Sequence, residues 1–357
     1  LPGVQFTASH NPAEYNGVKF CLPGAAPISA ELLKAIARET TAVPVPAVVP
    51  GEITTRSILA DYASYLHSLV ELDGLPKLRI VVDAGNGMAG LTTPEVLAGL
   101  GVEVIGLYLE LDPDFPNHPP NPLDPANLID AKRAVVEHSA DLGLVFDGDA
   151  DRCFFIDECG EVVDPAVIVA VVARAALGRE PGASIVVNTI TSQSVAEVVA
   201  EAGGRLVVSP VGHTHIKARM AEHGAVFGGE HSAHYYFRDF WGADTGMLAA
   251  LTVLSLIGKS GLTMSALGRG LPHYFSSGEI NTAVTDSKAV IARVAEDLAG
   301  LGQTSWPDGL LVRGADWWVS VRESNTEPLL RLNVEAKTPE FMIELRDRAL
   351  AVIRKGT

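Results

Sequence analysis

The chain alternates short apolar runs rich in valine and isoleucine with longer segments of helical periodicity. The order is clearest where Leu78–Val82 predicts a strand, Thr93–Leu100 a helix, Val102–Leu109 a second strand and Leu142–Phe146 a third. A strand–helix–strand order predicts a parallel sheet with helices covering its faces. The sequence therefore predicts an α/β fold.

The same order recurs further along the chain and then changes. A long apolar helix is expected after Asp164, and a strand, a helix and a strand follow over Ser184–Val187, Ser194–Ala202 and Arg205–Ser209. Beyond about Leu271 the pattern predicts an antiparallel sheet with helices on one face. The last part of the chain is therefore expected to be a separate α+β domain.

Net charge, the length of the apolar runs and the cysteine content limit the partners and the location that the sequence allows. The formal net charge of -16 argues against nucleic acid or an anionic membrane as partner, because both need a basic face. The apolar runs Ala166–Leu177 and Met247–Ile257 are shorter than the roughly 20 residues of a membrane-spanning helix, so they predict buried helices. Three cysteines without metal-ligand spacing, Cys21, Cys153 and Cys159, predict reduced thiols in a cytoplasmic protein.

The acidic loop Phe146–Arg152 (FDGDADR) is the most specific chemical signal in the sequence. Its carboxylates, Asp147, Asp149 and Asp151, occupy alternate positions after an apolar strand, and the glycine lets the loop fold around one hard cation, for which Mg²⁺ is the natural choice. The ligand order of an EF-hand is absent. A solvated acidic turn is the alternative, but an arginine directly behind three aspartates is an odd choice for solubility.

The serine loop Thr7–Pro12 (TASHNP) follows the strand-like run Val4–Phe6. Serine, asparagine and proline are common turn formers, so a hydrophilic turn is one interpretation. The other is that Ser9 is a nucleophile. The other chemical segments of the chain must decide between the two.

Three further segments have a chemical and a plain interpretation. In Gly229–His234 (GEHSAH), the alternating Glu, Ser and His would project from one face of an extended chain and bind vicinal sugar hydroxyls, although a polar edge strand has the same pattern. The segment Arg322–Pro328 (RESNTEP) offers a guanidinium, two hydroxyls and turn N–H groups to a phosphate, or is an ordinary turn. The spacing of Asp83–Gly90 (DAGNGMAG) is not G-x-G-x-x-G, which favours a structural turn.

Together, TASHNP, DGDADR, GEHSAH and RESNTEP resemble, in this order, the α-D-phosphohexomutase family of phosphomannomutases and phosphoglucomutases, over nearly the whole chain. The resemblance implies three similar mixed α/β domains and a smaller C-terminal α+β domain around one active site. It also implies that the first domain is truncated at its N-terminus, because the family has roughly 100 residues of α/β domain before the serine. The expected domains cover residues 1–50, 51–163, 164–270 and 271–357.

The resemblance also implies roles for individual residues. Ser9 would carry the phosphoryl group, and a phosphate oxygen on it would complete the Mg²⁺ ligands. Lys19 would be the general base or acid. The full implied set is the catalytic residues Ser9, Lys19, His10, Asn11 and Arg152, the metal ligands Ser9, Asp147, Asp149 and Asp151, and the substrate-binding residues His213, Glu230, Ser232, His234, Arg322, Ser324, Asn325 and Thr326.

The implied activity is reversible phosphoryl transfer between positions 6 and 1 of a hexose phosphate, through a phosphoserine and a hexose 1,6-bisphosphate that is both intermediate and activator. GEHSAH is most similar to the loop of the mannose and glucose type, so mannose 6-phosphate and mannose 1-phosphate are the expected substrates, with glucose phosphates beside them. One departure is Thr189–Ser192 (TITS), where family members often carry a basic residue. The expected protein is a monomer or a homodimer.

Three alternatives remain open at this stage. One is a phosphoglucosamine mutase, although those relatives tend towards GEQSGH. Another is an inactive sugar-phosphate-binding fragment, because of the missing N-terminal part. The third is an aspartate-nucleophile phosphatase with a D-x-D loop, in which TASHNP and RESNTEP would have no task.

Overall fold

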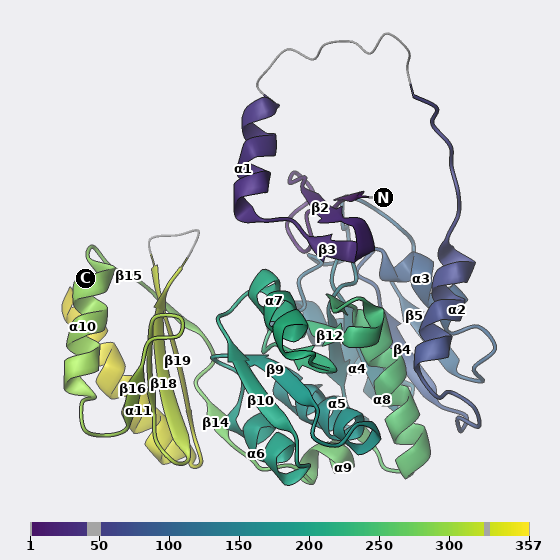
Figure 1. Ribbon diagram of the computed structural model, residues 1–357. Coiled ribbons are helices and arrows are strands. Elements are labelled where there is room, and N and C mark those ends of the chain that lie inside the picture. Colours follow the sequence, from purple (N-terminus) through teal and green to yellow (C-terminus); the bar gives the residue numbers. More distant parts are fainter. Residues whose placement is uncertain (1, 41–50, 325–328, 357) are drawn as a thin grey trace. The chain divides into compact units, whose positions relative to one another are not determined.

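The computed structural model describes residues 2–40, 51–324 and 329–356 (Figure 1). The chain forms two compact units. Unit 1 comprises Leu1–Glu161 and Asp239–Gly261, and unit 2 comprises Val162–Arg238 and Leu262–Thr357. The stretch 42–51 is rich in proline and valine, which predicts a linker, and except for Gly51 it lies outside the described residues. The four predicted domain boundaries stay a prediction.

Unit 1 begins with a small antiparallel sheet followed by a helix. Its elements are β1 (Gly3–Phe6), β2 (Val18–Leu22), β3 (Ala26–Pro27) and α1 (Ala30–Glu39). The serine loop lies in the connection from β1 to β2, which is closed by the Thr7 amide donating to the Gly17 carbonyl at 3.0 Å. A Cβ at Gly17 would lie 2.4 Å from the Thr7 carbonyl oxygen, so this closure requires glycine.

A larger sheet in unit 1 confirms the predicted parallel arrangement. Its strands lie in the order β5-β4-β6-β7, with β4 parallel to β5 and β6, and β7 antiparallel to β6. Strand β6 is buried along its whole length, and β4 and β6 end at the same edge of the sheet. The elements are α2 (Leu59–Leu69), β4 (Arg79–Asp83), α3 (Ala89–Val96), β5 (Glu103–Leu107), α4 (Ile129–Glu137), β6 (Leu142–Phe146), β7 (Cys153–Ile156), β13 (Ala243–Asp244) and α8 (Gly246–Ser260).

The helix predicted over Thr93–Leu100 is displaced, since α3 begins four residues earlier, inside the glycine-rich segment. The proline of Thr93-Pro94 suggests a helix start, but Pro94 lies inside α3. The first turn of α3 runs directly against Leu109: a Cβ at Gly90 would lie 2.0 Å from the Leu109 carbonyl oxygen. Glycine is therefore needed for packing here, and not only for a turn.

Unit 2 contains a second α/β sheet. Strands β10, β9 and β11 are parallel in that order, and β12 follows antiparallel to β11. The elements are β8 (Val162–Val163), α5 (Pro165–Arg179), β9 (Ser184–Asn188), α6 (Gln193–Glu201), β10 (Arg205–Ser209), α7 (His213–His223), β11 (Phe227–Gly229), β12 (Tyr235–Phe237) and α9 (Met264–Arg269). Helix α7 was not predicted, because its only buried side chains are Ile216 and Met220.

The C-terminal part of unit 2 is the predicted antiparallel sheet. Strands β14-β19-β18-β17-β16 lie in that order, β15 pairs with β19, and α10 and α11 lie on the same side of the sheet (Figure 1). The dipeptide Thr338-Pro339 predicts a helix start, and this is confirmed, because the Thr338 side chain accepts a hydrogen bond from the Phe341 amide and Pro339 is the first helical residue. The elements are β14 (Phe275–Ser276), β15 (Ile280–Ala283), α10 (Ser287–Asp297), β16 (Gln303–Ser305), β17 (Leu310–Arg313), β18 (Trp317–Glu323), β19 (Leu329–Ala336) and α11 (Pro339–Ile353).

Candidate active site

Ser9 lies in the turn after β1 with a left-handed backbone, at a φ of 56°. Few residues other than glycine adopt this conformation, and surrounding contacts must hold it in place. The Ser9 amide donates to Thr7 Oγ1 at 2.9 Å, and the Asn11 amide donates to the Ala8 carbonyl at 3.1 Å. These hydrogen bonds stabilise the turn that presents the Ser9 side chain.

The Ser9 hydroxyl lies among three polar side chains of unit 1. Its Oγ is 3.1 Å from Nδ1 of His10, donates to Oδ2 of Asp147 at 3.5 Å and accepts from a terminal guanidinium nitrogen of Arg152 at 3.4 Å. The structure therefore brings the serine loop and the acidic loop together. Of the predicted catalytic residues in the serine loop, Asn11 has an exposed side chain.

The acidic cluster, which consists of Asp147, Asp149 and Asp151, follows the buried strand β6. Carboxylate oxygens of the three residues lie within 4.8 Å of one another. The loop approaches the serine loop so closely that a Cβ at Gly148 would lie 2.3 Å from the Ser9 carbonyl oxygen. Gly148 is therefore needed for the contact between the two loops.

Burial and mutual repulsion raise the pKa values in this cluster. Burial raises the pKa of Asp147 to about 7, with Asp151 and Asp149 adding to the rise, even though Arg152 Nε donates to Asp147 Oδ2 at 2.7 Å. Burial, together with the charges of Asp149 and Asp244, raises the pKa of Asp151 to about 6. Like charges this close disfavour ionisation, and a bound cation would relieve that repulsion.

Lys19 already bridges two members of the cluster. Its Nζ donates to Oδ2 of Asp149 and to Oδ2 of Asp151, each at 3.2 Å. Burial lowers the pKa of Lys19, but the charges of Asp151 and Asp149 outweigh burial and raise the pKa above its ordinary value. Lys19 is therefore a cation in this arrangement.

One oxygen of the cluster points to a metal ion. Oδ2 of Asp149 accepts from Thr7 Oγ1 at 2.7 Å and from Lys19, whereas its Oδ1 is buried and has no hydrogen-bond partner among the described residues. A buried oxygen without a donor costs free energy, and a bound cation would satisfy it. Three convergent carboxylates with such an oxygen fit a hard divalent cation.

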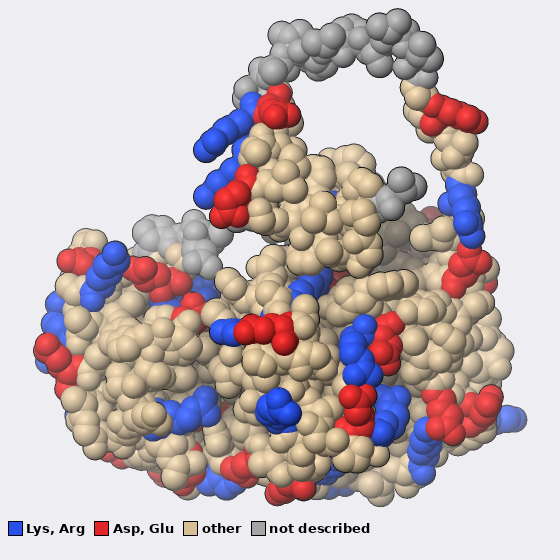
Figure 2. All heavy atoms as spheres, viewed as in Figure 1, with Lys and Arg blue, Asp and Glu red and all other residues tan. Residues whose placement is uncertain are grey.

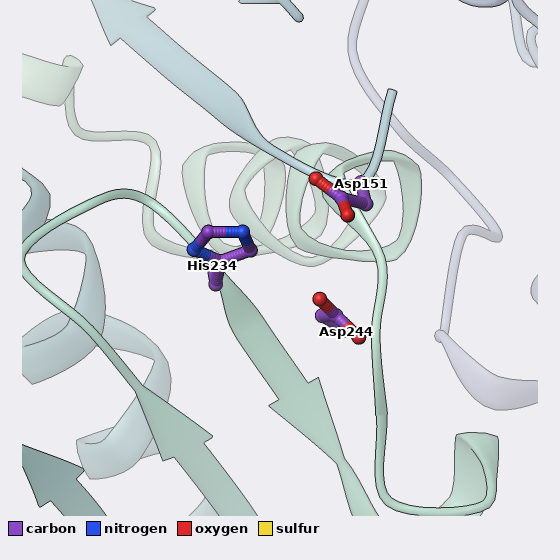
Figure 3. A group of neighbouring side chains, drawn as sticks. All are labelled: Asp151, His234 and Asp244. Atoms are coloured by element: carbon purple, nitrogen blue, oxygen red, sulfur yellow. The ribbon is translucent and has the colours of Figure 1, made fainter. Parts of the chain in front are cut away.

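A fourth carboxylate, Asp244, lies at the side of the cluster. Figure 3 shows the Asp151 and Asp244 side chains, and a carboxylate oxygen of each lies within 4.8 Å of the other. Asp244 immediately precedes Thr245, whose side chain caps α8, and a Cβ at Gly246 would lie 2.7 Å from the carbonyl of Arg152. The start of α8 therefore packs directly on the acidic loop.

The glycine-rich segment DAGNGMAG supports the acidic loop from another side. The Met88 amide donates to the Gly148 carbonyl at 2.9 Å, and a Cβ at Gly87 would lie 2.6 Å from the same oxygen. Its backbone is left-handed at Asn86, with a φ of 60°. The predicted structural turn is therefore confirmed, and it also positions the acidic loop.

In unit 2, GEHSAH is a turn and not the extended segment considered above. The Glu230 amide donates to the His234 carbonyl at 3.0 Å, the Ala233 amide donates to the Glu230 carbonyl at 3.2 Å, and Ala233 has a φ of 63°. The segment reverses the chain between β11 and β12, so its side chains do not alternate about one plane. The Ser232 hydroxyl lies 2.9 Å from Nδ1 of His234, so these two predicted residues do lie together.

Glu230 is buried and has several protein partners. Its carboxylate accepts hydrogen bonds from the Tyr236 hydroxyl at 2.5 Å, from the Asn188 side chain at 3.1 Å and from the Gly212 amide at 3.3 Å. The last contact lies at the start of α7, whose first residue is His213, an exposed side chain. Glu230 therefore joins the hairpin turn to the start of α7.

Arg322 lies near the end of β18 and is buried. Its guanidinium donates to Oε2 of Glu279 at 3.0 Å, and the Arg331 guanidinium donates to Oγ of Ser324 at 3.1 Å. The predicted residues Asn325 and Thr326 lie outside the described residues. Burial lowers the pKa of His231 to about 4, assisted by the charges of Arg322 and His234 and opposed by Glu230 and Glu279.

Several of these residues were missed by the sequence reasoning. Thr7 stands inside the quoted TASHNP segment, and its spacing of two from Ser9 is the signal for a side chain that caps its own turn. Asp244 precedes the helix cap at Thr245, but nothing in the sequence relates it to an acidic loop more than 90 residues away. Glu279 and Arg331 lie on separate segments, and only strand pairing brings them together.

Comparison with known proteins agrees with this architecture. Family descriptions of phosphoglucomutase/phosphomannomutase match along the chain: alpha/beta/alpha domain I at residues 1–44, domain II at 60–160, domain III at 164–275 and the C-terminal domain at 279–352. A protein of Xanthomonas campestris pv. campestris described as "Phosphohexose mutases" is 39% identical, with 99% of this chain and 80% of that protein covered. The phosphomannomutase of Escherichia coli strain K12 is 37% identical, with 98% and 79% covered.

Solved structures show the same similarity. A phosphoglucomutase/phosphomannomutase family protein from Burkholderia thailandensis has a TM-score of 0.89 at 30% identity, with 99% of this chain and 76% of that chain covered. An Aspergillus fumigatus N-acetylphosphoglucosamine mutase, solved with GlcNAc-6P and magnesium, has a TM-score of 0.72 at 16% identity, with 100% and 89% covered, which shows the shared fold.

These similarities define an enzyme of the isomerase class, a mutase. The chain belongs to the phosphoglucomutase/phosphomannomutase family, as its four segments predicted. Membership supports intramolecular phosphoryl transfer and excludes the aspartate-nucleophile phosphatase.

The remaining sequence predictions concern surroundings and partners. Among the described residues, no helix has the length and apolar character needed to cross a bilayer. All three cysteines are free thiols. On the face drawn in Figure 2, basic and acidic side chains are interspersed among uncharged areas. A cytoplasmic location, the lack of nucleic-acid binding and a monomeric or homodimeric state stay predictions.

Proposed function

We propose that this enzyme transfers a phosphoryl group reversibly between positions 6 and 1 of a hexose phosphate, with Ser9 as the phosphoryl carrier. The expected substrates are mannose 6-phosphate and mannose 1-phosphate, with the glucose phosphates beside them. Support for the sugar comes from the GEHSAH segment and from relatives named phosphomannomutase.

The observation that carries the proposal is the position of the Ser9 hydroxyl. It lies between His10 and Arg152 and beside Asp147 of the acidic cluster, on a backbone held in a left-handed conformation. A strained, well-supported serine beside a buried guanidinium suits a residue that must carry negative charge, because the guanidinium can donate to phosphate oxygens.

The proposed transfer balances in two steps. Phosphoserine at Ser9 loses its phosphoryl group to a substrate hydroxyl: the bond from phosphorus to Oγ breaks, a bond to the sugar oxygen forms, a base takes the hydroxyl proton, and Oγ takes up a proton in exchange. The resulting 1,6-bisphosphate reorients and returns its other phosphoryl group to Oγ: the bond from phosphorus to the second sugar oxygen breaks, a bond to Oγ forms, Oγ gives up its proton, and the released sugar oxygen takes one up. Because the two steps are chemically alike, one set of side chains serves both ends of the sugar.

Lys19 is the proposed proton carrier, as base in one direction and acid in the other. Its two contacts with the acidic cluster favour the ammonium form, which supports the acid role directly. A cation bound at the same carboxylates would weaken the attraction that raises the pKa of Lys19, so metal binding and the base role are compatible.

The acidic cluster is the proposed Mg²⁺ site, with Oδ1 of Asp149 as the best-supported ligand atom. When bound, the ion would stabilise negative charge on the group being transferred. Arg152 holds Asp147 in place through Nε and through its backbone amide, which donates to Oδ1 of Asp147 at 3.1 Å.

The proposed substrate contacts lie in unit 2. Ser232 and His234 offer a hydroxyl and an imidazole to sugar hydroxyls, and buried Glu230 fixes the turn that carries them. Arg322 and Ser324 are the proposed contacts of the phosphate that does not react, with Asn325, Thr326 and His213 as further expected contacts.

The deciding experiment labels the carrier. The purified protein is incubated with glucose 1,6-bisphosphate carrying labelled phosphate, and mass spectrometry locates the label. Label on Ser9 is the expected result, and label on any other residue contradicts the proposal. Rates with mannose 1-phosphate, glucose 1-phosphate and glucosamine 1-phosphate then rank the substrates, and a preference for the amino sugar would favour the phosphoglucosamine alternative.

A further inference from the structure

A buried aspartate at the end of β4 pairs with a histidine of the β5 loop, which consists of residues 108–124. Nε2 of His118 lies 3.2 Å from both carboxylate oxygens of Asp83, and Nδ1 lies 2.9 Å from the Pro119 carbonyl. A neutral imidazole has one N–H, so both ring nitrogens can donate only when the ring is protonated. The hydrogen bond with Asp83 raises the pKa of His118, although burial lowers it. The contacts therefore fit an imidazolium paired with a carboxylate.

This pair is nearly enclosed by protein. The side chains of His118 and Asp83 are 10% and 0% exposed. Removing two charges from water costs free energy, and apolar side chains of similar volume would often stabilise a fold as well. An ion pair does fix the direction of its partners. The Gly85 amide donates to Oδ1 of Asp83 at 2.9 Å, so the carboxylate that orients His118 is itself held by the backbone of its own turn.

Asn86 attaches the earlier part of the β5 loop. Its backbone amide donates to the Tyr108 carbonyl at 2.9 Å, and its Nδ2 donates to the Glu110 carbonyl at 2.9 Å. Its Oδ1 accepts from the Asn117 side chain at 2.8 Å. The pair of His118 with the end of β4 then fixes the part of the loop that follows.

The part that follows leads to the acidic loop. Pro120 is buried, and a Cβ at Gly148 would lie 3.4 Å from Cβ of Pro120 and 2.3 Å from the Ser9 carbonyl oxygen. Pro120 therefore lies on the side of Gly148 where the serine loop and the acidic loop meet. Because Gly148 separates Asp147 from Asp149, a shift of Pro120 would disturb the backbone between two members of the acidic cluster.

We propose that His118 is a positioning residue for the acidic cluster: paired with Asp83, it keeps Pro120 packed on Gly148 and so holds the three carboxylates in place for a hard divalent cation. His118 acts through Pro120 and the backbone of the loop. As applied to the metal ion, the inference rests on the proposed function. As applied to the conformation of the acidic loop, it does not.

The first test measures Mg²⁺ affinity by calorimetry. His118→Ala should weaken Mg²⁺ about 10-fold, and His118→Gln should recover part of that loss, because an amide N–H can still donate to Asp83. The control is His67→Gln in the same unit, which removes an imidazole whose Nε2 lies 2.6 Å from the Val96 carbonyl. The control should bind Mg²⁺ like wild type. An unchanged affinity in His118→Ala, or an equal fall in His67→Gln, overturns the inference.

A double variant tests whether the pair acts as a unit. Asp83→Asn should weaken Mg²⁺ about as much as His118→Gln does, and the variant with both substitutions should lose no more than either alone, because one contact can be broken only once. Losses that add in the double variant would mean that the two residues act separately, which contradicts the pairing.

A third measurement uses wild type alone, in case a variant does not fold. In protein labelled with ¹⁵N-histidine, the ring signals of His118 should shift when Mg²⁺ binds, because the loop that His118 supports closes on the ion, whereas those of His67 should not. Ring signals of His118 that stay unchanged at saturating Mg²⁺ contradict the positioning role.

The last measurement needs no metal and separates the inference from the proposed function. The Met88 and Arg152 amides donate to groups of the acidic loop, so their hydrogen exchange reports on its conformation. In EDTA both amides should exchange faster in His118→Ala than in wild type, while the Leu97 amide in the same unit keeps its rate. Equal acceleration at Leu97 would indicate general loosening and overturn the inference. If only the two loop amides accelerate and wild type binds no Mg²⁺, the positioning role stands and the proposed metal site fails.

Discussion

The acidic cluster of unit 1 and the arginine pair of unit 2, which consists of Arg322 and Arg331, are similar arrangements of opposite charge. In the acidic cluster, three carboxylates form ion pairs with Lys19 and Arg152. In the arginine pair, two guanidiniums form ion pairs with Glu279. When all side chains are counted as ionised and the neighbouring Asp244 is left out, each group has one charge in surplus, and each has a buried atom without a partner among the described residues. The sign of the surplus agrees with the class of ligand proposed for each, which is a cation in unit 1 and a phosphate in unit 2.

The two groups differ in how the backbone holds them. The arginine pair lies on regular strands, so local β-pairing positions it. The acidic cluster lies on an irregular loop with Ala150 at a φ of 60°, and it depends on contacts from the serine loop, DAGNGMAG and the start of α8. Substitutions far away in sequence should therefore disturb the acidic cluster more than the arginine pair.

The substitution with the largest expected effect should abolish turnover, which depends on unit 1, without weakening sugar-phosphate binding in unit 2. Ser9→Ala removes the proposed phosphoryl carrier, so mutase turnover should fall by about 10⁴-fold or more, while hexose phosphate should still bind at the proposed contacts Arg322 and Ser324. Coupled-assay rates and calorimetry on the same preparation test this. Loss of hexose phosphate affinity equal to the loss of turnover would contradict the separation.

A smaller effect is expected within the acidic cluster itself. Asp149→Ala removes the oxygen that lacks a partner, so the affinity for Mg²⁺ should fall by about 100-fold or more. Asp114→Ala, an exposed aspartate of unit 1, is the control. The thermal midpoint should change little, because a loop carboxylate contributes little to the core. Unfolding of the variant at ambient temperature would argue for a structural role instead.

Thr7 tests whether a distant contact orients the cluster. Its hydroxyl accepts from the Ser9 amide and donates to Oδ2 of Asp149, which directs the other oxygen away. Thr7→Val keeps the shape and removes only the hydroxyl, so Mg²⁺ affinity should fall about 10-fold, with Thr7→Ser restoring most of it. Equal Mg²⁺ affinity in Thr7→Val and wild type, measured by calorimetry, would show that Asp149 needs no such support.

The sequence was most informative where a site is made from neighbouring residues. Apolar side chains at four of the five positions of Leu142–Phe146, followed by alternating aspartates, predicted both a buried strand and a converging acidic loop, and both are present. Ser9 could be singled out because TASHNP stands in a recognisable order with other segments. The chemical roles assigned to these residues stay predictions.

What the sequence could not provide depends on contacts between distant segments. Polar residues alternate at 230–234, which is typical of an extended strand. The same alternation occurs in this tight turn, because the backbone hydrogen bonds that form the turn cannot be read from the sequence. Arg331 looks like an ordinary strand residue until the register with Arg322 is known. The sequence predicted a structural turn at Gly87 and Gly90 but not their packing partners, which are more than 18 residues away.

Substitution of Glu335 has the smallest expected effect. It tests whether a buried charged group binds a ligand only where charge is in surplus and a buried atom has no partner. This buried carboxylate on β19 accepts from the Gln193 amide at 2.8 Å and from Trp318 Nε1 at 3.0 Å, so its oxygen Oε1 is satisfied by protein donors. By this criterion we expect no ligand at Glu335. Glu335→Gln keeps an oxygen acceptor and should leave the affinities for Mg²⁺ and glucose 6-phosphate unchanged.

Its effect should appear in the pH dependence of stability. Burial raises the pKa of Glu335 above its ordinary value of 4.5, so the folded protein holds this proton more tightly than the unfolded chain. The free energy of unfolding of wild type should therefore fall as the pH rises from about 4.5 through the raised value. Glu335→Gln should lack this fall in the free energy of unfolding, and at pH 8 it should be as stable as wild type or more so, within about 1 kcal/mol.

Urea unfolding at pH 5 and pH 8 measures this pH dependence, with Glu344→Gln, at an exposed glutamate, as the control. A variant that is destabilised at both pH values would mean that the negative charge itself holds Gln193 and Trp318 in place.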